Sequence, residues 1–242
     1  MLELYASPDD LVPLFEAELE PPEEIEHKGF SARASLRTVR GRTNRVQIGA
    51  SDPISVLDSW PAGKQLADEI AAQRDSFDFC SLRLGCSFVP DRGCRFTWLR
   101  VSAELRTAGV ESEGAQSVAF DLFPRDVLEK RTYKRSYNVT PSAKFAFLEL
   151  SAGRSSEEEH IRYEPRLTAA GLLTDLPTWT FDALDRSGLV GSSELFLLAK
   201  KPKGQKLEAR FRVAAEVATL LGRVPLRRYR DPELLDKLFP LA

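Results

Sequence analysis

The sequence predicts a mainly β protein, an antiparallel β-sandwich with a few short peripheral helices. From Phe77 to Arg230, apolar and polar residues alternate with period two in many short segments, and turns rich in glycine and proline separate these segments. Helical periodicity is scarce in this stretch, which disfavours alternating βαβ units. We expect two packed antiparallel sheets over residues 76–230, a mixed helix and strand segment over residues 1–75 packed on them, and a short helix over residues 231–242.

Length and composition are those of a folded globular chain. The 242 residues are 43% hydrophobic and 29% charged, with 14 glycines and 15 prolines, which excludes disordered, collagen-like and coiled-coil classes. The longest apolar runs, such as Leu195–Ala199, are far shorter than the roughly 18 residues of a membrane-spanning helix. The first ten residues lack the pattern of a secretory signal. We therefore expect a soluble, cytoplasmic protein.

The clearest pair of strands surrounds a turn that ends at Gly93. Apolar residues occupy alternate positions before and after this turn. A three-residue loop that ends in a left-handed glycine favours a hairpin. The predicted register places Phe88 opposite Phe96 and Cys86 opposite Trp98, so that apolar residues share one face.

The same pattern recurs around a turn at Gly204. Alternation is strict from Leu207 to Val217 after the loop, and the predicted hairpin register sets Ala199 against Leu207 and Leu195 against Phe211. Further strands are expected between the two hairpins, at Ser117–Phe123, Arg131–Val139, Phe145–Leu150 and His160–Ala169.

Two irregularities and a few helices complete the expected fold. Pro165 places its strand at a sheet edge or at a bulge, and the shift in apolar phase after Trp98 predicts a β-bulge there. Gly153–Glu159 is expected to be a surface loop. The expected helices are Ser7–Leu19, Ala62–Gln73 with Leu66 and Ile70 facing inward, and Asp231–Leu238.

The three cysteines are expected to be free thiols. In the predicted hairpin, Cys80 and Cys86 lie roughly 20 Å apart along one strand, and Cys94 is several residue pairs away from Cys86. A disulfide needs Cα atoms within about 7 Å, and the spacing lacks the close cysteine pairs of a zinc site. The sequence therefore predicts no disulfide and no metal, which suits a reducing cytoplasm.

Catalytic signatures are missing from the sequence. There are only two histidines, His27 and His160, and no zinc-protease, nucleophile-elbow, dinucleotide-binding or P-loop motif. Asp182 and Asp185 lie close to aromatic residues, which leaves a carboxylate-dependent hydrolase as an alternative. The prediction is a protein with no cofactor and no catalytic activity.

Charge is segregated along the chain although the net charge is only −2. Residues 1–26 contain nine acidic and no basic residues, and residues 200–230 contain ten basic and two acidic residues, which gives −9 and +8. Three outcomes compete: the acidic segment docks on the basic one, copies associate head to tail, or a separate charged partner binds. A basic segment of this size could also lie on an anionic membrane surface.

A second basic segment, Lys130–Tyr137, interleaves basic and aromatic residues. Tyrosines beside an arginine on one strand face suit a nucleotide or single-stranded nucleic acid, whereas charged residues on an edge strand also block unwanted strand pairing. The candidate binding residues are Tyr133, Arg135, Tyr137, Arg223, Arg227, Arg228 and Arg230.

The function expected from these observations is that of a non-catalytic interaction module. Segregated charge and the lack of a catalytic motif favour a sandwich that associates with a partner protein or with itself through charged surfaces. Binding of a phosphorylated ligand or nucleic acid through the basic and aromatic strand is the main alternative.

Overall fold

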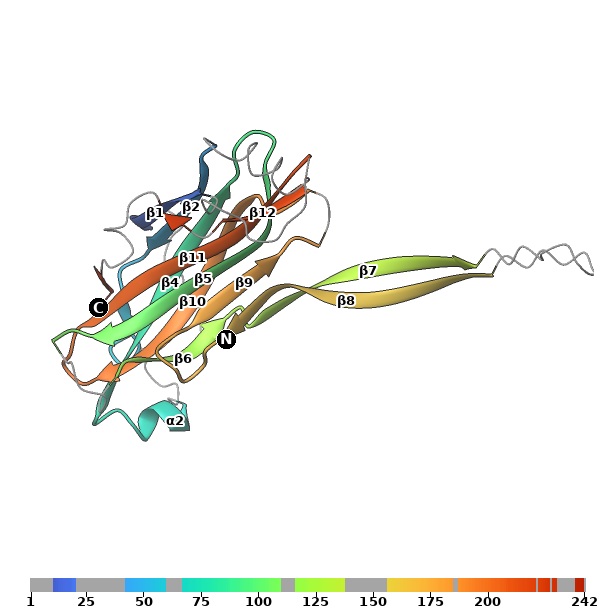
Figure 1. Cartoon of the computed structure of the whole chain (residues 1–242). Coiled ribbons are helices and arrows are strands. Elements are labelled where there is room, and N and C mark those ends of the chain that lie inside the picture. The colour runs from blue at the N-terminus through green and yellow to red at the C-terminus, as the bar shows by residue number, and fades with distance from the viewer. Residues whose placement is uncertain are drawn as a thin grey trace, which may run out of the picture.

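Two antiparallel sheets pack face to face in the computed structural model of this chain (Figure 1). The structure describes residues 11–20, 42–59, 67–109, 116–137, 156–184, 187–220, 222–226, 228–229 and 238–241. Strands make up most of these residues, which confirms the predicted mainly β sandwich. In this part of the chain, no helix has the length and hydropathy needed to cross a membrane.

Sheet A has the strand order β13-β1-β2-β4-β10-β6, and the short strand β3 also pairs with β4. It takes strands from both ends of the chain. Its members are β1 (Val12–Glu20), β2 (Asn44–Ala50), β3 (Ile54–Ser55), β4 (Phe77–Val89), β6 (Val118–Phe123), β10 (Gly191–Pro202) and β13 (Arg228–Tyr229).

Sheet B has the strand order β12-β11-β5-β9-β8-β7, and β14 also pairs with β11. Its members are β5 (Arg95–Thr107), β7 (Asp126–Tyr137), β8 (Ser156–Ala170), β9 (Thr178–Asp182), β11 (Leu207–Thr219), β12 (Gly222–Leu226) and β14 (Phe239–Pro240). A single helical turn, α2 (Asp68–Ala71), is the only helix in the described residues.

The turn after β4 is an arch between the sheets and not a hairpin turn. β4 pairs within sheet A and β5 within sheet B, so the predicted pairing of Phe88 with Phe96 and of Cys86 with Trp98 is wrong. Gly93 does adopt the predicted left-handed conformation, with a φ of 76°. The glycine therefore closes a turn that carries the chain from one sheet to the other.

The turn after β10 is a second arch. β10 lies in sheet A and β11 in sheet B, so the predicted pairing of Leu195 with Phe211 and of Ala199 with Leu207 is also wrong. Gly204 has the expected left-handed φ, at 73°. The observed neighbours are β4 with β10 and β5 with β11, both antiparallel, so the two arches lie side by side with their turns at opposite ends of the sandwich.

Alternation of apolar residues does not distinguish a hairpin from an arch. A hairpin places the two apolar faces in one sheet, whereas an arch places them opposite each other across the core, and each strand buries one face in both cases. In this protein the buried side chains of β4, such as Leu84, meet those of sheet B across the core. Tertiary packing therefore decides between two arrangements that share one pattern.

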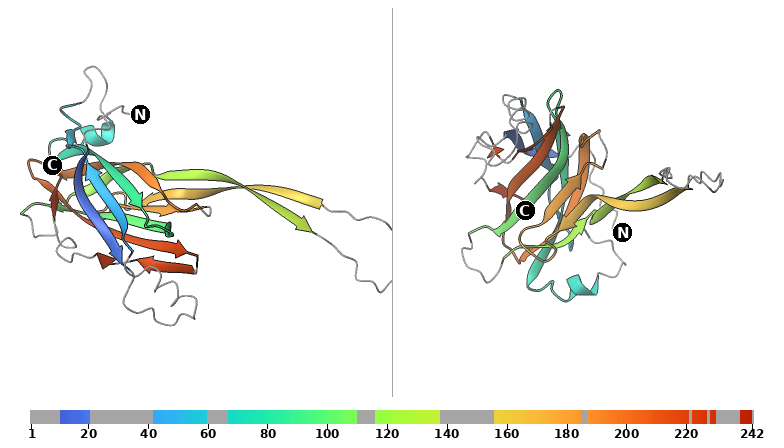
Figure 2. Two further views of the ribbon diagram at one scale, coloured as in Figure 1. Left: turned by 90° about the horizontal axis from the view of Figure 1, so that it is seen from above. Right: turned by 45° about the vertical axis from the view of Figure 1, so that its right-hand side comes forward.

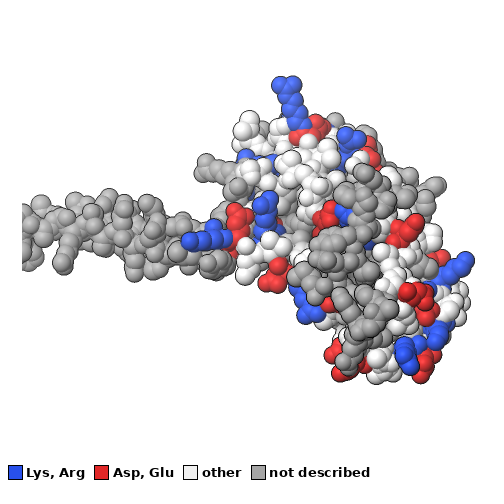
Figure 3. Space-filling view, turned by 180° about the vertical axis from the view of Figure 1, so that it is seen from behind, with Lys and Arg blue, Asp and Glu red and all other residues white. Residues whose placement is uncertain are grey.

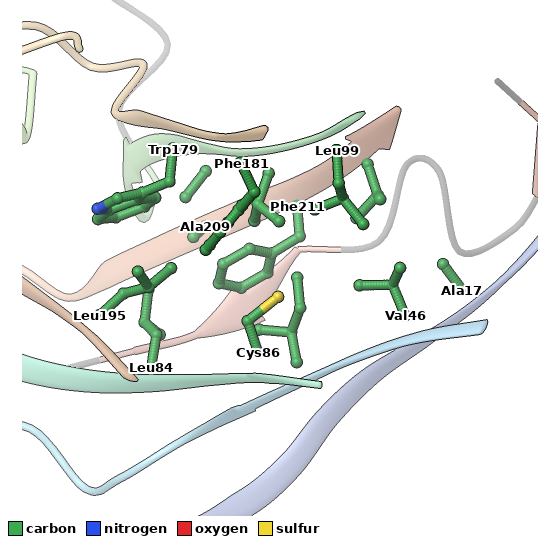
Figure 4. Close-up of a cluster of buried hydrophobic side chains, with 14 of the residues drawn as sticks. Ala17, Val46, Leu84, Cys86, Leu99, Trp179, Phe181, Leu195, Ala209 and Phe211 are labelled. Carbon is green, nitrogen blue, oxygen red and sulfur yellow. The ribbon is translucent and has the colours of Figure 1, made fainter. Parts of the chain in front are cut away.

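A single large core fills the space between the sheets. In Figure 4, Leu84, Cys86 and Leu195 of sheet A point toward Phe211 and Trp179 of sheet B, and all of these side chains are almost completely buried. Burying this much apolar surface is the main term that stabilises such a sandwich.

The cysteines of β4 are part of this core. Burial raises the pKa of the Cys80 thiol to about 11, although the nearby charge of Lys201 opposes the shift. Burial also raises the pKa of Cys86. Cys94, at the end of the first arch, is partly exposed, and burial raises its pKa as well.

The bulge predicted near Trp98 is confirmed. Along the β5 and β11 pair, Trp98 is registered with Glu216 and Phe96 with Val217, which leaves Thr97 as the extra residue. The bulge explains the phase shift, because the buried side chains of β5 fall on even positions before it and on odd positions after it.

The predicted amino-terminal helix is wrong where the structure describes it. Residues 12–20 form β1, in which Ala17 and Leu19 are buried and pairing with β2 provides the backbone hydrogen bonds. The buried side chains at positions 17 and 19 follow the period of a strand. Ser7–Asp10 lie outside the described residues.

The other peripheral predictions have mixed outcomes. Ile70 is buried in α2, as expected, whereas residues 62–66 of that predicted helix, with Leu66 among them, lie outside the described residues. Residues 156–159, predicted to be part of a loop, belong to strand β8. Phe145–Leu150 and residues 231–237 lie outside the described part of the chain.

Candidate functional site

The most unusual feature of the structure is a two-stranded ribbon that projects from the sandwich. Here "the ribbon" means residues 128–137 of β7 and residues 156–165 of β8. Figures 1 and 2 show it extending away from both sheets in every view. Ten residues per strand at about 3.3 Å per residue give it a length of roughly 30 Å.

A β-bulge marks the point where the ribbon leaves the body. Val127 is registered with Leu167, but Leu128 is registered with Pro165, so Arg166 is the extra residue. This confirms the bulge predicted from Pro165, since proline cannot donate a hydrogen bond to a neighbouring strand. Burial changes at the same point: Leu167 is buried, whereas Leu128 is 54% exposed.

The base of the ribbon is tied to the body by polar contacts. The carbonyl of Arg125 accepts a hydrogen bond from the N–H of Ala169 at 2.6 Å, and the Arg125 guanidinium donates to Asp121 Oδ1 at 2.8 Å. Arg166 and Glu129 form an ion pair across the ribbon at 3.7 Å. These contacts position the first residues of β7 against the end of β6.

Both outer edges of the ribbon are open. β7 pairs only with β8, and β8 pairs with β9 only through residues 167–170. No strand in the described part of the chain pairs with either outer edge of the ribbon. Open edges leave backbone N–H and C=O groups that can bind another strand.

Neither face of the ribbon has an apolar sequence. Successive residues of a strand alternate between its two faces, so the adjacent charges at Lys130-Arg131, Lys134-Arg135 and Glu157-Glu158 put charge on both faces. A face of this composition resists burial because desolvating charges is unfavourable. The edges are therefore the parts of the ribbon that suit a partner.

The two edges carry opposite charge. β7 contributes only basic charges from position 130 to 137, a net +4, and β8 contributes four glutamates and one arginine from position 156 to 164, a net −3. The backbone register sets basic against acidic positions, with Lys134 opposite Glu159 and Arg135 opposite Glu158. Opposite charges across a strand pair favour this register.

Exposed apolar side chains gather around the base of the ribbon. Of the eight large apolar side chains that are exposed in the described residues, six lie on the end of β6, the start of β7 or the turn after β8. We call these six the apolar shoulder: Phe123, Val127, Leu128, Leu172, Leu173 and Leu176.

The turn after β8 holds three of the shoulder leucines in a fixed conformation. Leu173 donates its N–H to the carbonyl of Ala119 at 2.7 Å, and Ala119 donates back to the carbonyl of Thr174 at 2.8 Å. Leu173 has a φ of 59°, a conformation that is unfavourable for a side chain of this size, and it is 61% exposed. A strained backbone at an exposed leucine is a feature that often accompanies binding surfaces.

Neither the apolar shoulder nor the acidic edge of the ribbon was among the sites predicted from the sequence. The sequence signal for the shoulder was a turn that contains three leucines, because a turn of this length is usually polar. The leucines are Leu172, Leu173 and Leu176, between Gly171 and Pro177. The glutamates of β8 were assigned to a loop, although their alignment with Lys134 and Arg135 indicates a paired strand.

The predicted binding residues fall into separate places. Tyr133, Arg135 and Tyr137 lie on β7, at one end of sheet B, and Arg223 lies on β12, at the other end. Arg228 belongs to β13 in sheet A. Arg227 and Arg230 lie outside the described residues. The structure does not bring these residues together into one site.

Several basic side chains of segment 200–230 form ion pairs or hydrogen bonds within the sandwich. Arg212 pairs with Glu104 Oε2 at 2.8 Å, and Arg223 pairs with Glu216 Oε1 at 3.5 Å. Lys200 donates to Gln73 Oε1 at 3.2 Å and lies over the Phe77 ring. On the face seen in Figure 3, acidic and basic side chains of the body are interspersed.

Strand pairing brings the acidic and basic segments of the sequence together at the end of β1. Strand β1 belongs to the acidic segment and pairs with β13 of the basic segment, so that Glu20 is registered with Arg228. The pairing covers only the last two residues of β1, and Glu16 of the same strand pairs instead with Arg45 of β2.

The structure adds little to the hydrolase alternative. Asp182 ends β9, and burial raises its pKa, but Asp185 lies outside the described residues. Within the described residues, no group of three His, Cys, Asp or Glu side chains is arranged to hold a metal ion.

Comparisons with known proteins do not assign a family. No family model matches the chain, and no curated protein sequence matches it. Among solved structures, the chain is similar to the NetB toxin of Clostridium perfringens in its membrane-inserted form, with a TM-score of 0.29, 6% identity and 93% of each chain covered. It is also similar to the delta-toxin of Clostridium perfringens, with a TM-score of 0.27, 8% identity and 82% of each chain covered. At TM-scores this low, the likeness establishes neither a shared fold nor a shared function.

Proposed function

We propose that this protein is a non-catalytic interaction module that binds a protein partner through the β7–β8 ribbon. The sandwich acts as a rigid base, and the ribbon presents open strand edges to the partner. The observation that carries the proposal is that a charged ribbon of roughly 30 Å projects from the body, and that within the described part of the chain no strand pairs with either of its outer edges.

Strand addition is the binding mode that suits this geometry. Backbone hydrogen bonds from an added strand would provide affinity, and the charges along each edge would provide selectivity. An isolated two-stranded ribbon is only marginally stable in water, so a third strand would also stabilise the ribbon itself.

The apolar shoulder supplies a second contact beside the ribbon. Six exposed apolar side chains at its base give a partner a surface that loses water on binding. A partner that lies along a ribbon edge and reaches the body would cover part of this shoulder. The proposal places the protein in the cytoplasm, with its three cysteines reduced.

A shortened ribbon tests the proposal. Lys130 and Tyr163 are opposite each other in the register, so residues 131–162 can be replaced by an Asn-Gly turn that closes the hairpin there. We expect tagged full-length protein to retain a protein partner from cells at low salt and to release it at high salt, because salt screens exposed charges. The shortened variant should retain its melting temperature and lose the partner.

Two results would contradict the proposal. One is recovery of the same proteins by the full-length and the shortened chain, which would move the binding surface to the sandwich. The other is recovery of nucleic acid in place of protein, which would favour the basic and aromatic strand as a ligand site.

A further inference from the structure

We propose that the partner of the ribbon is a second copy of this chain, and that copies join head to tail, with the β7 edge of one ribbon beside the β8 edge of the next. This inference rests on the proposed function, because it names the partner of the same edges. It follows from the direction of the strands, from their charges and from the open backbone on both sides of the ribbon.

Strand direction permits this pairing without a change in the ribbon. β7 runs away from the body and β8 runs back toward it (Figure 1). If two ribbons lie side by side and point the same way, β7 of one copy is antiparallel to β8 of the next. The pair between copies then repeats the antiparallel geometry of the pair within each ribbon.

Charge selects this pairing over the symmetric alternatives. A head-to-tail contact sets the +4 of β7 beside the −3 of β8, whereas a two-fold contact sets β7 beside β7 or β8 beside β8. Like charges directly opposite each other on neighbouring strands are destabilising. The register within the ribbon already sets Lys134 and Arg135 against glutamates, and a neighbouring copy can provide the same match.

The arrangement also leaves the charged faces of the ribbon in water. Only the edges become paired, so no charged face has to be buried, and the unfavourable desolvation of ion pairs is avoided. Each copy offers one basic and one acidic edge, so a dimer would leave two edges open. Head-to-tail contacts therefore continue into a closed ring or a filament.

A charge-swapped ribbon tests the inference in the full-length chain. The variant combines Lys134→Glu and Arg135→Glu on β7 with Glu158→Lys and Glu159→Lys on β8. The two opposite-charge pairs within the ribbon are kept, so the ribbon remains matched to itself and to other copies of the variant. Against the natural sequence, however, the swapped positions of both strands meet like charge when the register of the ribbon is repeated between copies.

The expected result is selective association at low salt. The natural chain should associate with itself, the swapped variant should associate with itself, and association between the two should be about tenfold weaker. The matched control swaps an exposed ion pair on sheet A, by Glu16→Arg and Arg45→Glu, and should mix freely with the natural chain. Differently tagged chains, mixed and analysed by sedimentation and co-purification, measure each association, and circular dichroism verifies folding.

The outcomes separate this inference from the proposed function. Free mixing of natural and swapped chains would overturn the head-to-tail arrangement, and so would a natural chain that is monomeric at every salt and protein concentration. If that monomeric chain still retains a different protein that the shortened ribbon loses, the proposed function stands without self-association. If shortening the ribbon changes neither self-association nor partner recovery, both proposals fail.

Discussion

The Phe88 ring on β4 packs edge-on against the Phe181 ring on β9, with the ring centroids 4.9 Å apart and the planes at 68°. β4 belongs to sheet A and β9 to sheet B, so this pair joins the two layers next to the first arch. Both rings are at most 5% exposed. Aromatic pairs of this geometry contribute about 0.5 to 1.5 kcal/mol beyond the burial of their area.

Phe88→Ala should therefore destabilise the whole sandwich. We expect a loss of about 3 to 5 kcal/mol in the free energy of unfolding, because a large buried ring is replaced by a cavity. Urea denaturation followed by circular dichroism measures the loss. Phe123→Ala is the control, since Phe123 is 57% exposed and should lose less than about 1 kcal/mol. Similar losses in both variants would contradict the described core.

Gly171 and Gly204 should tolerate alanine differently. Both have left-handed φ values, but a Cβ at Gly171 would lie 2.3 Å from the Leu176 carbonyl oxygen, whereas nothing lies within 4 Å of a Cβ at Gly204. We expect Gly204→Ala to lower the free energy of unfolding by about 1 kcal/mol through backbone strain alone. Gly171→Ala should lower it by clearly more, and thermal melting compares the two. Equal losses in the two variants would mean that the turn after β8 can move away from an added Cβ without a cost in free energy.

The three thiols should react with a thiol reagent in a defined order. Cys94 is partly exposed, whereas Cys80 and Cys86 are buried and burial raises their pKa, to about 11 for Cys80. At pH 8 we expect Cys94 to react first, because it is the thiol that is partly exposed, although burial raises its pKa as well. Cys80 and Cys86 should react only after unfolding in urea, because burial disfavours the reactive thiolate. Mass spectrometry identifies the modified cysteine. Rapid labelling of Cys86 in the folded protein would be incompatible with its position in the core.

Glu104 should make stability depend on pH. Burial acts to raise its pKa, but the hydrogen bond and charge of Arg106, together with the charges of Arg212 and Arg210, outweigh burial and lower it. A carboxylate with a lowered pKa stabilises the folded state above its ordinary pKa range, and this contribution is lost as the pH falls through the lowered value.

The test of this dependence is Glu104→Gln. At pH 7 the variant should lose about 1 to 2 kcal/mol in the free energy of unfolding, because charge-assisted hydrogen bonds are weakened. The difference from the natural chain should shrink steadily below the ordinary carboxyl range, as followed by melting curves over a pH series. A difference that stays constant from neutral to acidic pH would show that the charge of Glu104 is not the cause.

The apolar shoulder should matter for association and not for folding. Leu172→Ser combined with Leu173→Ser removes two exposed leucines that contribute little to the core. We expect the melting temperature to stay within a few degrees of that of the natural chain. Self-association, measured by sedimentation at low salt, should weaken because less apolar surface is buried on binding. Leu220→Ser is the matched control because Leu220 is 99% exposed and lies in the turn after β11, at the far edge of sheet B. An equal effect of the control would remove the shoulder from the interface.

Two β-bulges in the strands could be predicted from the sequence. The bulge at Thr97 was visible because the apolar phase changes after Trp98, and the bulge at Arg166 was visible because proline disrupts the ladder next to it. The helix expected at Ser7–Leu19 failed for the opposite reason. A short apolar segment fits both a strand and a helix, and only pairing of β1 with β2 decides between them.

Local chemistry in the sequence determined most of the strands between Phe77 and Thr219, the left-handed turns at Gly93 and Gly204, and the layered antiparallel class, because alternation and glycine conformation act over a few residues. Which strands are neighbours was decided by the tertiary structure alone, since an arch and a hairpin bury the same alternating residues. The projecting ribbon was likewise decided by the tertiary structure. Residues 128–137 and 156–165 have ordinary strand sequences, and only the arrangement of the strands in the two sheets leaves these segments without a neighbouring strand on their outer edges, among the strands that the structure describes.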